Sequence, residues 1–289
     1  RDLSHGPHLP GAIAQRRCPM QPIRWASMKS RPKHGHPPYR HHEAPPPLFH
    51  EADLRAPNAL LMLLEGRAPW EWAAMLAALP WLKRLPRGDG HPVIVFPGLG
   101  ATDITTSPMR GFLQDMGYSA YPWKQGFNFG PRGGVIEAVR QYLQRIAERH
   151  DDKVSLVGWS LGGLYARELA KEFPALTRCV VTLGSPFAGH PRATNAWRFY
   201  QMVSGQDIHD PEMLEQIRGA PPVPTTSIYS KTDGVVAWQC SLMEDSPLAE
   251  NIEVHASHIG MGMNPLALYA IADRLAQPRH HVGEAELEH

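Results

Sequence analysis

The chain has 289 residues, and its 29 lysines and arginines against 28 aspartates and glutamates give a net charge of only +1. A near-neutral chain lacks the basic excess that nucleic-acid binding requires, so we expect no nucleic-acid partner. Its three cysteines, Cys18, Cys179 and Cys240, form neither a disulfide framework nor a metal-binding pair. The sequence shows no membrane-spanning run and no secretory pattern at its start, so we expect a cytoplasmic protein.

The first 50 residues are rich in proline, histidine and arginine and show no hydrophobic periodicity. Such a segment buries too little apolar surface to offset the entropy of ordering it, which favours a disordered tail over a histidine metal site. Met28 followed by Lys29 is typical of a natural start, so we expect residues 1–27 to derive from vector or upstream sequence. Residues 51–289 are predicted to form one domain.

Two short helices are predicted ahead of the first strand, over residues 59–64 and 70–82. Both are rich in leucine, alanine, methionine and tryptophan. We interpret them as a helical pair packed on the core, and the alternative is an apolar flap that shapes access to a site.

Strands and helices then alternate along the chain. The predicted strands are residues 93–96, 119–121, 154–157, 178–183, 226–229 and 253–255, and the predicted helices are residues 106–116, 135–149, 161–173 and 265–275. This alternation predicts an α/β fold, with a mostly parallel central sheet and helices on both faces. It breaks between about residues 187 and 224, where helices over 195–203 and 211–218 indicate a small helical cap inserted between two core strands.

One sharp turn carries a candidate nucleophile. Gly158-Trp159-Ser160-Leu161-Gly162 follows a predicted strand and opens a helix. Such a turn holds the serine in strained backbone angles between small neighbours, and the unpaired N–H groups of the helix start favour anionic charge beside it. We predict that Ser160 is a nucleophile; the alternative is a turn whose serine only caps the helix.

A serine nucleophile needs a base, and the base needs an orienting acid. His258 follows the last predicted strand and precedes the terminal helix, where a loop can bring its imidazole to the turn. His255, at the predicted strand end, is the competing base. Asp233 is the predicted acid, on a turn that follows the preceding strand, with Glu244 and Asp245 as alternatives.

The intermediate of such a reaction also needs hydrogen-bond donors for its oxyanion. We predict the backbone N–H of Leu161, next to the nucleophile, and that of Leu99, in the glycine-rich loop 96–100. An ordinary glycine-rich turn is the alternative for this loop, which lacks the ending of a phosphate-binding loop. The chemistry requires no metal and no organic cofactor.

These motifs resemble the α/β-hydrolase superfamily, and within it the bacterial lipase and esterase-like branch. The likeness covers about residues 90–277 and is carried by segments 95–100, 158–163, 182–186, 230–236 and 257–260. It implies Ser160, Asp233 and His258 as a catalytic triad, with Leu99 and Leu161 as the oxyanion hole. Residues 127–131 are similar to a loop that lies near the pocket in that family.

Apolar residues near the expected site predict a substrate pocket, for which core packing is the alternative explanation. They are Trp123, Phe127, Phe129, Trp159, Phe187 and Trp197. The predicted function is hydrolysis of small to medium apolar carboxylic esters through an acyl-enzyme intermediate, with a small-molecule ester as partner.

Two other functions stay open: a true triacylglycerol lipase, and a catalytically silent hydrolase fold that serves as a binding module. A transient lipid-surface contact through residues 70–82 is a further alternative. No oligomeric state is predicted.

Overall fold

The computed structural model describes residues 54–204 and 211–278 of the chain. The predictions made for residues 1–50 fall outside the described residues. No helix in the two described ranges combines the length and the apolar character needed to cross a bilayer.

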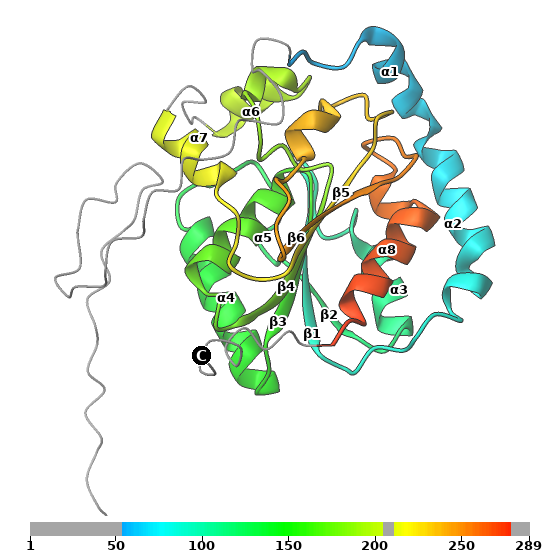
Figure 1. The fold of residues 1–289 in the computed structure, drawn as a ribbon, viewed down its shortest axis with the longest axis vertical. Helices are drawn as coiled ribbons and strands as arrows, with labels where there is room; N and C mark the ends of the chain where they lie inside the picture. The colour runs from blue at the N-terminus through cyan, green and yellow to red at the C-terminus, as the bar shows by residue number, and fades with distance from the viewer. Residues whose placement is uncertain (1–53, 205–210, 279–289) are drawn as a thin grey trace, which may run out of the picture. The chain divides into compact units, whose positions relative to one another are not determined.

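A six-stranded sheet lies at the centre of the fold, and all of its neighbouring strands are parallel (Figure 1). Its order is β2-β1-β3-β4-β5-β6. The strands are β1 (Pro92–Phe96), β2 (Ser119–Pro122), β3 (Val154–Trp159), β4 (Thr177–Leu183), β5 (Thr225–Tyr229) and β6 (Ala249–Glu253). The predicted parallel α/β fold is confirmed.

Helices cover both faces of this sheet (Figure 1). The α-helices are α1 (Ala59–Leu64), α2 (Ala68–Leu82), α3 (Ser107–Asp115), α4 (Val135–His150), α5 (Leu161–Glu172), α6 (Trp197–Ser204), α7 (Pro211–Arg218) and α8 (Pro265–Leu275). Short 3-10 helices are η2 (Glu65–Arg67), η3 (Pro191–Ala193), η4 (Trp238–Ser241) and η5 (Met261–Met263). Helices α4 and α5 pack on one face, whereas α3 and α8 pack on the other with α2 beside α8.

Helix α4 shows how the sequence pattern builds these layers. Its buried residues are Val139, Tyr142, Leu143, Ile146 and Ala147. They recur every three or four positions and so form one stripe of the helix, which packs on β1 and β3, while charged residues occupy the solvent side.

The strand order reverses at β1. Strand β2 lies on one side of β1, and β3, the next strand in the sequence, lies on the other side. The carboxyl ends of β1 and β3 therefore flank the point at which open parallel sheets bind their ligands. The loop 97–100 and the turn at Ser160 both leave the sheet there.

The last strand is where the sequence prediction was wrong. Residues 253–255 were predicted, whereas β6 spans Ala249–Glu253. Because β6 is an edge strand, each of its side chains is at least partly exposed and no apolar run marks it. The buried Val254, which is part of the predicted strand, lies just beyond β6.

Helix α5 approaches the end of β1 so closely that one position excludes any side chain. A Cβ added at Gly162 would overlap the carbonyl oxygen of Phe96. We predict that Gly162→Ala lowers the free energy of unfolding by about 3 kcal/mol or prevents folding, because backbone atoms cannot move aside. Gly111→Ala is the control: its Cβ meets no atom within 4 Å in a helix, so thermal unfolding should show an unchanged or higher Tm. Equal Tm values for the two variants would contradict this packing.

Candidate active site

Ser160 occupies a strained position between β3 and α5. Its backbone has φ 54° and ψ −122°, a conformation that costs a non-glycine residue about 1–3 kcal/mol. The Ser160 N–H donates to the carbonyl of Leu183 at 2.7 Å and so ties the turn to β4. Gly158 allows the tightness of this turn, because a Cβ there would overlap the backbone of Gly163. The predicted strand-to-helix turn is present in the fold.

Three residues from distant parts of the sequence form one hydrogen-bond chain. His258 Nε2 lies 2.9 Å from Ser160 Oγ, and His258 Nδ1 lies 2.7 Å from Asp233 Oδ2. The other carboxylate oxygen, Asp233 Oδ1, accepts from the N–H groups of Val235 and Val236, both at 2.8 Å. Asp233 and His258 are 3% and 6% exposed, so the chain is shielded from water except near the serine.

The competing candidates lie away from this arrangement. His255 is exposed and its carbonyl accepts from the side chain of Asn264. Glu244 and Asp245 are exposed in the loop between β5 and β6. The structure therefore brings together the three residues that the sequence favoured and leaves the alternatives on the surface.

The charges around His258 favour its protonated form. Burial by itself would lower the pKa of His258, but the charge and hydrogen bond of Asp233 and the charge of Glu65 outweigh it, so the pKa is raised. An imidazole in this setting readily accepts and holds a proton taken from the Ser160 hydroxyl.

A second Ser–His–Asp chain provides a useful contrast. His91 Nε2 lies 2.8 Å from Ser155 Oγ, and His91 Nδ1 lies 2.5 Å from Asp89. These residues stand at the amino end of the sheet, and Ser155 is fully buried. Burial, with the charge of Arg178, lowers the pKa of His91 despite its bonds to Asp89. This chain has the distances of a triad, but its serine and imidazole have no solvent access and its imidazole does not favour the proton.

The two predicted oxyanion donors lie on either side of Ser160. Leu161 is the first residue of α5, where an N–H has no acceptor within the helix, and Leu99 follows β1 in no regular element. Within the described ranges neither N–H donates a hydrogen bond to a protein group. Both residues line the same cavity as Ser160.

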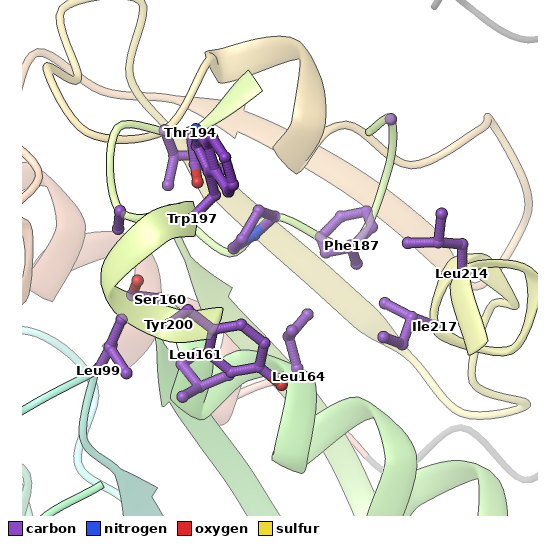
Figure 2. Close-up of a pocket in the computed structure, with 14 residues that line it drawn as sticks. Leu99, Ser160, Leu161, Leu164, Phe187, Thr194, Trp197, Tyr200, Leu214 and Ile217 are labelled. Atoms are coloured by element: carbon purple, nitrogen blue, oxygen red, sulfur yellow. The ribbon is translucent and has the colours of Figure 1, made fainter. Parts of the chain in front are cut away.

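An apolar cavity opens beside Ser160. Together with the open solvent at its mouth, it holds about 740 Å³ of empty space. Figure 2 shows Leu214 and Ile217 of α7 on the opposite side of the cavity from Ser160 and Leu99. The two predicted pocket residues Phe187 and Trp197 line it, the latter from α6. The cavity is thus lined by helices α6 and α7, by the loops after β1 and β4 and by the first residues of α5.

The other four predicted pocket residues are not among the residues that line this cavity. Trp123 is fully buried in the core, where it packs against Tyr165. Phe127 and Phe129 stack on each other, with Phe127 62% exposed. Trp159 donates its indole N–H to the carbonyl of His258 at 3.0 Å and so supports the loop of the base.

The cavity is also lined by large side chains that the sequence did not point to, among them Leu164, Tyr200, Leu214 and Ile217. The spacing carried a usable signal. Tyr200 lies three positions after Trp197, and Ile217 three after Leu214, so each pair shares one face of a cap helix.

No group of three or more histidine, cysteine, aspartate or glutamate side chains in the described ranges is arranged to hold a metal ion. The arrangement at Ser160 is one that can activate a hydroxyl for attack on an electrophilic carbon without a bound ion.

Parts of the sequence are similar to known proteins. A triacylglycerol lipase of Pseudarthrobacter phenanthrenivorans is 32% identical over 108 residues, covering 34% of each chain. A pimeloyl-(acyl-carrier protein) methyl ester esterase of Legionella pneumophila (strain Paris) is 29% identical over 98 residues, covering 34% of this chain and 39% of that protein. The matches thus span less than two-fifths of these relatives.

Among solved structures, Aspergillus fumigatus lipase B superimposes with a TM-score of 0.51 at 20% identity, over 66% of this chain and 53% of that one, a likeness of fold. The sequence model of the alpha/beta hydrolase family matches residues 66–286. Since that match covers most of the chain, the protein belongs to the alpha/beta hydrolase family.

Proposed function

We propose that the protein is a serine hydrolase of carboxylic esters, with Ser160 as nucleophile, His258 as general base and Asp233 as the acid that orients the base. The observation that carries the proposal is the unbroken hydrogen-bond chain from Asp233 through His258 to a strained, cavity-lining Ser160. The catalytically silent alternative is disfavoured, because a binding module would have no need of this chain.

In the proposed first step, Ser160 Oγ attacks the ester carbonyl carbon while His258 Nε2 accepts the hydroxyl proton. The N–H groups of Leu99 and Leu161 would donate to the oxyanion of the tetrahedral intermediate. That intermediate collapses, and the alcohol leaves with the proton from His258. Water then attacks the acyl-Ser160 ester by the same route and releases the carboxylic acid, so the enzyme returns to its starting state.

The cavity supports small to medium apolar esters as substrates. Its walls are mostly leucine, isoleucine, valine and aromatic side chains, which suit an apolar substrate. Esterase and lipase are also the names of the relatives described above.

A lipase acting at an oil–water interface is the second candidate. It is favoured by large apolar side chains exposed on α1 and α2, among them Leu63 at 76%, Trp70 at 78% and Trp81 at 73% exposure. Exposed aromatic patches of this kind mark interaction surfaces, including lipid ones.

Removal of the nucleophile should abolish the chemistry. We predict that Ser160→Ala lowers kcat for a p-nitrophenyl ester on the order of 10⁶-fold and prevents labelling by a fluorophosphonate probe. Ser155→Ala is the matched control, because it removes the buried serine of the second Ser–His–Asp chain and the variant should still be labelled. Labelling of Ser160→Ala at the wild-type rate would disprove the assignment.

The pH profile should report His258. The base must be neutral to accept a proton, so kcat/KM should fall as the pH drops through its pKa. Since that pKa is raised, the midpoint should lie above that of an ordinary histidine. Asp233→Asn should move the midpoint to lower pH and reduce kcat by about 10⁴-fold. A profile unchanged in this variant would rule out Asp233 as the partner of the base.

The acyl-chain preference should follow the width of the cavity. We expect Ile217→Trp to fill space on the cap side and shift the best substrate in a panel of p-nitrophenyl esters toward shorter acyl chains. Wild-type activity that falls with chain length and shows no rise above the solubility limit of the ester supports an esterase. A sharp rise at that limit supports the lipase candidate instead.

A further inference from the structure

The segment that joins α1 to α2 contacts both loops of the proposed triad. Glu65, in η2, is only 5% exposed. Its Oε1 accepts from the N–H of Gly234 at 2.7 Å and from that of His258 at 2.9 Å, while its Oε2 accepts from Ile259 at 2.8 Å. One carboxylate therefore links the loop of the acid to the loop of the base.

A second carboxylate, from α2, also binds the base loop. Glu71 of α2 accepts from the N–H and the hydroxyl of Ser257, both at 2.6 Å. Its charge is paired with Arg67 at 3.2 Å, and Arg67 also donates to the carbonyl and hydroxyl of Thr232 in the acid loop. Across residues 54–204 and 211–278, by contrast, no cation forms an ion pair with Glu65.

The two loops are shaped to receive this segment. A Cβ at Gly234 would overlap the carbonyl of Leu61 in α1, and a Cβ at Gly260 would overlap the carboxylate of Glu71. The acid loop thus meets the backbone of α1, and the base loop packs directly against the carboxylate of Glu71.

We propose that Glu65 is a positioning residue of the active site, which holds the acid and base loops in place relative to each other and puts a negative charge close to His258. This inference rests on the function proposed above. It gives the pair α1–α2 a role in the reaction, beyond packing on the core.

The charge matters at the step where Ser160 transfers its proton. The imidazolium that forms is buried, and an anion fixed in a site shielded from water stabilises it more than an exposed anion does. Among the residues that the structure describes, the charged groups next to His258 are Asp233, from the loop after β5, and Glu65, from η2. The Glu71–Arg67 ion pair binds the neighbouring Ser257. Burial lowers the pKa of His258, and Asp233 and Glu65 raise it.

Glu65→Gln tests the inference because it removes the charge and retains an amide oxygen in place of Oε1. Its amide N–H₂ faces the N–H of Ile259, so one hydrogen bond is also lost. We expect kcat to fall about tenfold to 100-fold for a p-nitrophenyl ester, as it does when catalytic groups shift by a fraction of an ångström to about 1 Å. Loss of the Glu65 charge should lower the pKa of His258, which then stays neutral to lower pH. The acid limb of the pH profile, where kcat/KM falls as the pH drops, should therefore move to lower pH.

Glu71→Gln is the matched control, since it weakens the same base loop but removes a charge that Arg67 already compensates. It should lower the Tm and leave the acid limb where it is in wild type. An unchanged kcat and acid limb in Glu65→Gln, or an equal shift of the limb in both variants, would overturn the inference.

Glu65→Asp keeps the test decisive if Glu65→Gln does not fold. It retains the charge but shortens the reach to the two loops, so kcat should fall while the acid limb stays near that of wild type. A kcat within twofold of wild type would refute the positioning role. Fluorophosphonate labelling of wild type distinguishes failure of the proposed function from failure of the Glu65 inference. An unlabelled wild type refutes the proposed function. If wild type is labelled, a negative result concerns Glu65 alone.

Discussion

The proposed chemistry depends on one short contact, the 2.9 Å between Ser160 Oγ and His258 Nε2. A proton passes between these atoms only if loops separated by about a hundred residues meet within a fraction of an ångström. The parallel sheet supplies that meeting point, because the loops after β3, β5 and β6 all leave from the carboxyl ends of the strands, at the same side of the sheet. The strained backbone of Ser160 then lifts its hydroxyl clear of the sheet.

Residues of η2 and α2 hold the loops that the sheet brings together. Loops at a sheet edge are held less firmly than the strands, and burying a carboxylate is costly unless several donors bind it. Glu65 and Glu71 meet that condition by accepting from the loops themselves, so the carboxylates and the loops stabilise each other. The same two carboxylates therefore contribute to the order of the loops and to the electrostatic environment of His258.

The features that could be predicted from the sequence are those set by neighbouring residues, whereas contacts between residues far apart in the sequence could not. The turn at Ser160 was predictable because its steric demands fall on adjacent residues, and amphipathic helices such as α4 follow from local spacing. The edge strand β6 lacks an apolar pattern, and Trp123 satisfied the pocket pattern but is buried in the core. Glu65 carried no signal, because its partners lie 169 to 194 positions away and offer only backbone N–H groups.

The most direct test of this account is to trap the covalent intermediate. Rapid acid quenching of the wild-type protein with a slowly deacylating ester, followed by peptide mass spectrometry, should find the acyl group on the peptide that contains Ser160, with one acyl group per molecule. An acyl group on another residue, or hydrolysis of the ester with no acyl-protein formed, would contradict the account.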